Sequence, residues 1–181
     1  MKLRDMVSTL GLAIAASGAA AASPYAGQES RAIKALSPED VSALLSGKGM
    51  GFAKAAELNG FAGPAHVLEL APQLALTAEQ RARTESLLAS MSAKASSSGR
   101  ALVDKERELD QLFATRAITP ERLSSALKEI GALQAQVRSA HLEAHLAQVE
   151  ILSPEQNARY RALRGYGAPG AHSGHDHGAR R

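Results

Sequence analysis

The 181-residue chain contains no cysteine and no tryptophan, and aromatic residues make up only 3% of it. The absence of cysteine excludes disulfide bonds, thiolate metal sites and thiol catalysis, and it fits an oxidising compartment in which a free thiol is a liability. With so few aromatic residues, the chain offers little on which nucleic acid bases could stack. Its stability must therefore come from the packing of secondary structure alone.

The sequence also lacks a charge imbalance and the common catalytic motifs. Twenty-one basic residues against 18 acidic ones give a formal net charge of +3, which is too balanced to predict nucleic-acid binding. No nucleophile elbow, phosphate loop, nucleotide fingerprint or His-Glu-x-x-His motif is present. We therefore predict a protein that is not an enzyme and that requires no cofactor.

The first 22 residues have the composition of a secretory signal peptide. Lys2 and Arg4 form a basic start, residues 6–16 form a modest apolar core, and residues 20–22 are alanines suited to a cleavage site. The apolar core is too short and too rich in small residues to span a membrane. A buried or amphipathic N-terminal helix is less favoured, because no polar residue repeats within the core. We expect cleavage before Ser23, export to the periplasm and a mature chain without an integral membrane segment.

Four segments begin with a hydroxyl residue, then proline or alanine, then glutamate. The hydroxyl can cap a helix, proline suits the first helical position, and glutamate favours the positive end of the helix dipole. The four starts are at Ser37, Thr77, Thr119 and Ser153. They predict helices over about 38–45, 78–115, 120–151 and from 154 onward, with weaker helical stretches over about 52–58 and 65–71, the last one stopped by Pro72.

No segment shows the alternating pattern of a strand, so the predicted fold class is all-α. The two long segments are joined by a short connection and must fold back as an antiparallel helical hairpin with short flanking helices. The run Ser96-Ser97-Ser98-Gly99 predicts a bend or a mobile turn in the first long helix. The predicted organisation is a signal peptide over 1–22, short helices over 23–73, a helical domain over 74–165 and a disordered His-rich tail over 166–181.

The second long segment carries two apolar faces. One face should pack on the first long helix and comprises Leu123, Leu127, Ile130, Leu133 and Val137. The other lies roughly 100–180° around the helix and comprises Leu142, Leu146 and Val149. This second face needs a partner of its own, which is the last helix, a second subunit or an unfolded client protein. As a client-binding surface it would act through apolar contacts.

Six histidines supply two candidate metal sites. His141 and His145 are one helical turn apart and can share one ion, with His66 or Glu69 as the third ligand. Their position beside the first apolar face favours instead a partly buried structural pair. The tail sequence His172-Ser173-Gly174-His175-Asp176-His177 can coordinate Cu(II), Ni(II) or Zn(II) weakly, which suits scavenging or buffering. A solvated tail without function is an equal alternative.

Two phrases of the sequence are alike, residues 76–80 (Leu-Thr-Ala-Glu-Gln) and residues 152–156 (Leu-Ser-Pro-Glu-Gln). In each, the hydroxyl and the glutamine three residues later can form a capping box. The shared positions are Leu76, Thr77, Gln80, Leu152, Ser153 and Gln156. Paired in an exported, cysteine-free helical chain, the phrases resemble the Leu-Thr-x-x-Gln repeats of the Spy/CpxP family over about residues 74–163.

This resemblance implies a periplasmic, ATP-independent refolding or anti-aggregation chaperone of envelope stress. It also implies a four-helix homodimer whose concave side holds unfolded or misfolded envelope proteins. The related ZraP- and CnrX-like proteins are heavy-metal sensors, so the alternative is a periplasmic metal-binding protein that senses or buffers zinc, copper or nickel. A trimeric holdase of the Skp type is a third possibility. Residues 25–72 depart from the family, and their helices could cover the concave side.

Overall fold

The computed structural model describes residues 23–166. The predicted signal peptide and the histidines of the tail therefore lie outside the described residues. The chain divides into two compact units, one ending at Ser30 and one beginning at Arg31. The first contributes only the turns of residues 23–30, in which the Ala26 amide donates to the Ser23 carbonyl over 2.9 Å. All of the helices described below belong to the second unit.

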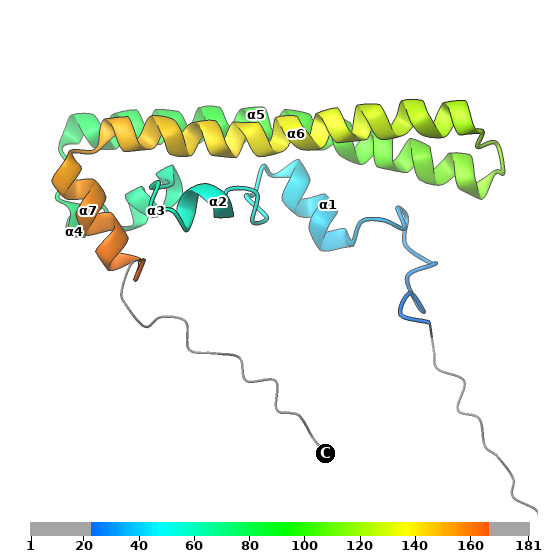
Figure 1. The fold of residues 1–181 in the computed structure, drawn as a ribbon, viewed down its shortest axis with the longest axis horizontal. Coiled ribbons are helices and arrows are strands. Elements are labelled where there is room, and N and C mark those ends of the chain that lie inside the picture. The colour runs from blue at the N-terminus through cyan, green and yellow to red at the C-terminus, as the bar shows by residue number, and fades with distance from the viewer. Residues whose placement is uncertain (1–22, 167–181) are drawn as a thin grey trace, which may run out of the picture. The chain divides into compact units, whose positions relative to one another are not determined.

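Within residues 23–166 the fold is all-α, as predicted, with no strand (Figure 1). Two long helices form an antiparallel hairpin, and five shorter ones accompany it. The helices are α1 (Pro38–Leu45), α2 (Lys54–Glu57), α3 (Pro64–Glu69), α4 (Ala71–Leu74), α5 (Ala78–Ala114), α6 (Pro120–Ile151) and α7 (Pro154–Leu163). None of them is both long and apolar enough to cross a membrane.

All four predicted helix starts are confirmed. The hydroxyls of Ser37, Thr77, Thr119 and Ser153 each accept a hydrogen bond from the backbone amide three residues later, over 3.0 to 3.3 Å. At three of these starts the side chain of that later residue also accepts from the N-cap amide, which completes a capping box. The caps satisfy amides that would otherwise lack a partner, and so they fix where each helix begins.

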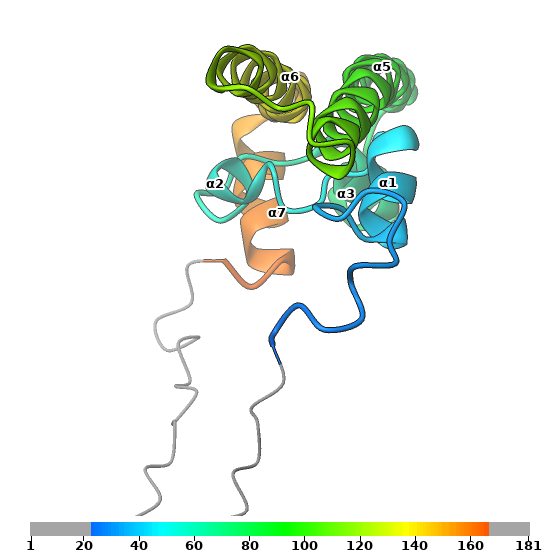
Figure 2. The same cartoon turned by 90° about the vertical axis from the view of Figure 1, so that its right-hand side faces the viewer.

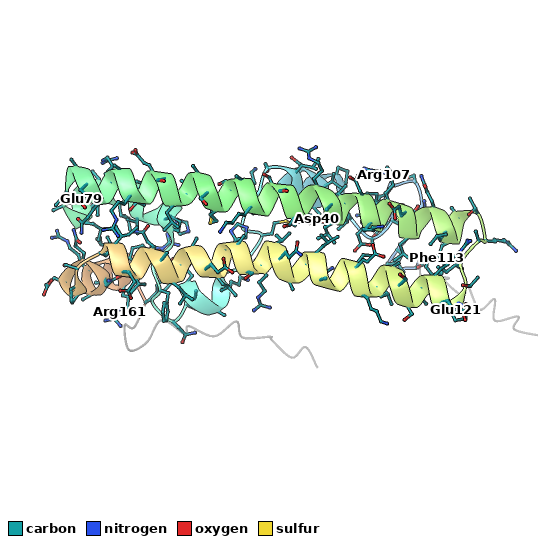
Figure 3. The ribbon with its side chains drawn as sticks, turned by 90° about the horizontal axis from the view of Figure 1, so that it is seen from above. Asp40, Glu79, Arg107, Phe113, Glu121 and Arg161 are labelled. Atoms are coloured by element: carbon teal, nitrogen blue, oxygen red, sulfur yellow. The ribbon has the colours of Figure 1, made fainter. Side chains whose placement is uncertain are left out.

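The hairpin and the N-terminal segment share one apolar core. α5 and α6 lie side by side along their length, as the view from above shows (Figure 3). The buried side chains of this core are Ile33, Leu44, Leu102, Val103, Ile130 and Val137, so two of the six come from the segment before the hairpin. A hairpin of two helices alone has a thin core, and the additional apolar side chains enlarge it.

The short helices lie on one side of the hairpin (Figure 2). α1 packs against α5, α2 packs against α6, and α3 contacts both long helices. A second core forms where α3, α4 and α7 meet, and it contains Ala62, Val67, Leu74, Leu152 and Tyr160. The segment over residues 31–74 is thus an integral layer of the helical unit.

The two similar phrases of the sequence meet in space. Gln80, at the start of α5, and Gln156, at the start of α7, form a reciprocal pair of amide hydrogen bonds over 2.8 and 3.0 Å. The Gln80 amide also donates to the Ile151 carbonyl over 3.0 Å, and the Gln156 amide donates to the Leu74 carbonyl over 3.1 Å. Each glutamine therefore completes its own capping box and also ties the starts of two helices together.

The prediction of a mobile turn as one alternative at residues 96–99 was wrong. α5 runs without interruption from Ala78 to Ala114, and Gly99 is buried within it. The backbone of α1 approaches so closely here that a β-carbon on Gly99 would overlap the Leu44 carbonyl. Gly99 therefore allows α1 and α5 to pack closely, whereas the sequence suggested that it interrupts α5.

Two further expectations need correction. Leu127, predicted as part of the face that packs on the first long helix, is 52% exposed, and Phe113 near the end of α5 is 55% exposed. Pro72 does not stop a helix but lies in the first turn of α4, where its missing amide hydrogen costs nothing. Leu127 and Phe113 lie toward the ends of α6 and α5 that the short connection joins.

Candidate metal-binding site

A cavity of about 390 Å³ lies between the hairpin and the residues that surround α2 and α3. Its lining combines nitrogen, oxygen and sulfur donors from four separate segments of the chain. These side chains are Met50, Glu57, His66, Met91, His141 and His145. The exposed ammonium group of Lys54 also borders the cavity.

His141 of α6 is one of the residues that line this cavity. The residue is 3% exposed, and its Nε2 atom is buried without a partner among the described residues. Its ring stacks on Phe52 with centroids 6.3 Å apart. Burial lowers the pKa of His141 below that of an ordinary imidazole, and the nearby charge of His145 lowers it by a smaller amount. The ring is therefore neutral at neutral pH, which is the form that binds a metal ion.

His145, one turn further along α6, is held in one tautomer. Its Nδ1 lies 2.8 Å from the Phe61 carbonyl oxygen. Because a carbonyl only accepts hydrogen bonds, we assign the ring proton to Nδ1, which leaves Nε2 with a free lone pair. A β-carbon on Gly63 would lie 2.8 Å from that Nε2, so the glycine is needed for the ring to fit. The backbone contact to Nδ1 is the kind that orients metal-binding histidines.

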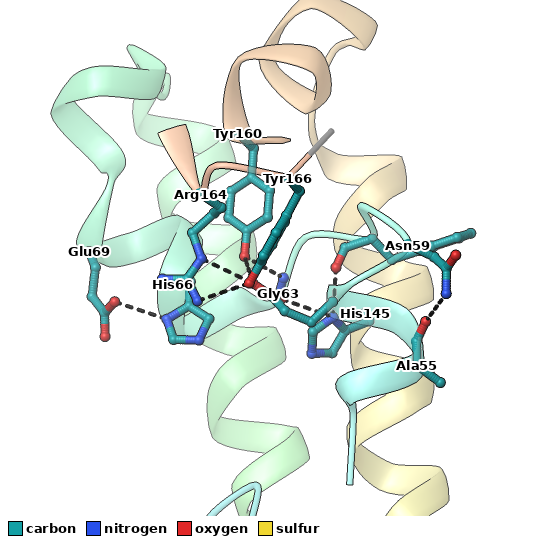
Figure 4. Close-up of polar contacts among 11 residues, drawn as sticks. Ala55, Asn59, Gly63, His66, Glu69, His145, Tyr160, Arg164 and Tyr166 are labelled. Atoms are coloured by element: carbon teal, nitrogen blue, oxygen red, sulfur yellow. Dashed lines mark hydrogen bonds and ion pairs between the residues drawn. The ribbon is translucent and has the colours of Figure 1, made fainter. Parts of the chain in front are cut away.

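Glu57 of α2 is the buried carboxylate beside these rings. Its Oε1 accepts hydrogen bonds from the hydroxyl groups of Tyr160 (2.7 Å) and Tyr166 (3.1 Å) and from Arg164 Nε (3.1 Å), as Figure 4 shows. Its Oε2 has no hydrogen-bond partner among the described residues and lies 3.7 Å from His145 Nδ1. Burial and the bond to this carboxylate raise the pKa of Tyr160, so its hydroxyl remains a donor. One oxygen of Glu57 thus holds α7, and the other remains available.

The two residues predicted as third ligands pair with each other. His66 Nδ1 lies 2.9 Å from Glu69 Oε2, both on α3 (Figure 4). His66 still lines the cavity, whereas Glu69 does not. Sequence reasoning missed Glu57, because α2 is a four-residue helix whose pattern gives no sign that it packs against α6.

The chemistry of the donor side chains fits a metal ion, although these side chains do not lie close enough together to share one. Two buried atoms without partners, His141 Nε2 and Glu57 Oε2, belong to residues that line one cavity, and both are common metal ligands. Among the described residues no three His, Cys, Asp or Glu side chains are close enough to hold one ion. Binding through such side chains alone would require them to rearrange.

The predicted client-binding face is partly accessible. Leu146 is 57% exposed, and Leu142 and Val149 on the same face are half-buried. α7 packs against α4 rather than over this face, so Leu146 is left uncovered within the described residues. The other predicted metal ligands, His172, His175 and His177, lie outside the described residues.

Comparison with known proteins gives one assignment. No curated protein and no solved structure matches the chain. A family model described as heavy-metal resistance matches residues 8–159. The match includes α1 to α6 and therefore every segment that lines the cavity. The chain belongs to the heavy-metal resistance family.

Proposed function

We propose that the protein binds a heavy-metal ion in the periplasm, as a sensor or a buffer, with His141 and His145 as the central ligands. The observation that carries this proposal is that His141 lines the cavity and that its buried Nε2 atom has no hydrogen-bond partner within the described part of the chain. A buried polar atom without a partner costs on the order of 1–3 kcal/mol. A bound ion would remove that cost, whereas a structural histidine would normally have a partner.

Glu57 is the best placed third donor. Its Oε2 has no hydrogen-bond partner in residues 23–166, and the hydrogen bonds to its Oε1 fix the orientation of the carboxylate. Imidazole and carboxylate together suit zinc, nickel and copper. When bound, the ion would supply positive charge beside a carboxylate that pairs with Arg164 and lies 3.7 Å from His145 Nδ1. Membership of the heavy-metal resistance family supports the same conclusion.

The test is metal binding by the full chain after His172, His175 and His177 are replaced with alanine. We expect calorimetry with zinc, nickel and copper to show a sub-micromolar site that survives this change. Adding His141→Ala should weaken binding by about 100-fold or more, since loss of second-shell partners alone already costs 10–100-fold. Glu143→Gln is the matched control, because Glu143 is exposed on the same helix and bonds to Ser139 instead.

A pH series provides a second measurement for the same variants. Because the pKa of His141 is lowered, protons should displace the ion only below the ordinary imidazole value of about 6.5. The charged and titratable residues that line the same cavity are Lys54 and Glu57 of α2, His66 of α3 and His145 of α6. Unchanged affinity in His141→Ala, or no sub-micromolar site once the tail histidines are replaced, would contradict the proposal.

A second function, an ATP-independent periplasmic chaperone, is supported by the uncovered Leu146 and by the paired Leu-Thr-x-x-Gln-like phrases. Half-buried Leu142 and Val149 extend the apolar surface around Leu146. Weak, reversible contacts with unfolded envelope proteins, or a contact between two copies in a homodimer, would both use such a surface. We propose it as a further property of the same chain.

Leu146→Asp should reduce the suppression of client aggregation, because it places a charge in the centre of this surface. The measurement is light scattering of a chemically reduced client without ATP. Leu127→Asp is the control, since Leu127 is 52% exposed on the same helix but lies outside the surface. Circular dichroism should show equal helix content in both variants. A wild-type protein that leaves several unrelated clients to aggregate would refute the chaperone function.

A further inference from the structure

The cavity contains both methionines that remain after the predicted signal peptide is removed. The chain has four methionines, and two of them, Met1 and Met6, belong to that peptide. The other two, Met50 and Met91, both line the cavity with His141. The apolar cores elsewhere in the described residues are built from leucine, valine, isoleucine, alanine and tyrosine.

Met50 is not placed as a core residue. It lies in the connection between α1 and α2 and is 42% exposed. Its φ angle of 43° is in the left-handed region, which is uncommon for a residue other than glycine. Methionine often fills irregular gaps in a core, but a gap-filling side chain would be buried. An exposed methionine that lines a cavity and has a left-handed backbone conformation instead indicates a role at that cavity.

Met91 approaches the cavity from a different helix. It is half-buried on α5, whereas His141 is on α6 and Met50 is in the connection before α2. Two methionines and one histidine from three separate segments therefore line one space. Thioether and imidazole ligands together suit a soft, monovalent copper ion better than the harder divalent ions.

The remaining donors and charges at the cavity also favour a soft monovalent ion. No three His, Cys, Asp or Glu side chains cluster among the described residues, as a tetrahedral zinc site would favour. Among the described residues, Glu57 is the one carboxylate that lines the cavity; it already pairs with Arg164, and Lys54 adds a positive charge at the border. A monovalent ion brings less uncompensated charge into this setting than a divalent one does.

We propose that the cavity binds a soft monovalent ion, Cu(I) or Ag(I), through the thioethers of Met50 and Met91 and the imidazole of His141. The inference rests on the proposed metal-binding function and specifies its cargo. His145 and Glu57 keep the ligand roles given them above, and the thioethers are added to them. The thioethers become the groups that determine selectivity.

The experiment uses the full chain with the three tail histidines replaced by alanine. Silver serves as the redox-inert probe, and Cu(I) is measured under anaerobic conditions in competition with a chromophoric chelator. Met50→Leu combined with Met91→Leu should lower the affinity for both ions by about tenfold or more, which lies within the range that supporting groups alone contribute to metal sites. Zinc and nickel affinities should not change, since leucine removes the sulfur at nearly equal volume.

Methyl-labelled methionine provides a readout that a merely structural role would not affect. Silver should shift the methyl resonances of Met50 and Met91, and zinc should leave them in place. The single variant Met50→Leu, at an exposed position, keeps the test valid if the double variant is unstable. Leu127→Met, which adds a methionine outside the cavity, controls for nonspecific binding of silver to thioethers and should show no shift of its own resonance.

The possible outcomes separate this inference from the proposed function. Binding of zinc or nickel that depends on His141, together with Cu(I) affinity unaffected by the methionine variants, overturns the inference and leaves the metal-binding function intact. Absence of any site after replacement of the tail histidines overturns both. Cu(I) and Ag(I) affinities that fall in the methionine variants, with the zinc affinity unchanged, establish the thioether site.

Discussion

Gly99→Ala is expected to destabilise the protein by about 2–3 kcal/mol, although alanine is the better helix former. The added β-carbon would overlap the backbone carbonyl of Leu44, and no side-chain rotation can relieve a contact with the backbone. α1 must therefore move away from α5. Leu44, now 3% exposed, would then lose part of its contact with the core. The measurement is chemical denaturation of the variant and the wild-type protein.

Gly131→Ala is the matched control on the other long helix. Nothing lies within 4 Å of the position where its β-carbon would be, so the substitution removes only the flexibility of glycine. We expect a stabilisation of about 0.5–1 kcal/mol. Equal changes in the free energy of unfolding for the two substitutions would contradict this prediction. They would mean that the effect at Gly99 comes from helix propensity and not from the close approach of α1.

Gln80→Glu is expected to lower the free energy of unfolding by about 2–3 kcal/mol at pH 7, because it removes two hydrogen-bond donors from a partly buried pair. The Gln80 amide donates to Gln156 Oε1 over 2.8 Å and to the Ile151 carbonyl over 3.0 Å. A carboxylate at position 80 would instead repel both acceptor oxygens, which carry partial negative charge. The starts of α5 and α7 would lose the bonds that tie them together. Thermal and chemical denaturation measure the loss.

Two comparisons make this prediction specific. Gln134→Glu introduces the same change at an exposed position of α6 and should alter the stability by less than about 0.5 kcal/mol. Acidification should restore part of the stability of Gln80→Glu relative to the wild-type protein, because a protonated carboxyl regains one donor. A deficit that stays constant from pH 7 to pH 4 would contradict the role of the amide as a donor.

Local signals in the sequence predicted the helices well. Each capped start combines a hydroxyl with a nearby glutamate, and such interactions act within one helical turn, so α1, α5, α6 and α7 begin where the sequence indicates. The hairpin follows from the short connection between two long helices. The spacing of His141 and His145 likewise placed both rings at one cavity.

Contacts between segments far apart in the chain were not predictable. Gly99 looked like a weakness because the sequence does not show that α1 lies across it. Glu57 and Met50 belong to short segments whose apolar pattern has too few residues to reveal a face. The same limit explains the exposure of Leu127, since periodicity shows that a helix has an apolar face but not how far the neighbouring layer extends.

The cavity has a consequence for the way in which metal binding and folding are connected. One wall belongs to the hairpin, and the opposite wall belongs to residues 49–66. An ion that contacts both walls binds only while the short helices are docked, so it shifts the docking equilibrium by mass action. By reciprocity, a distant substitution that loosens α1 or α2 would weaken the affinity for the ion without touching any ligand. The fraction of molecules with a docked N-terminal layer and the fraction with an occupied cavity then rise and fall together.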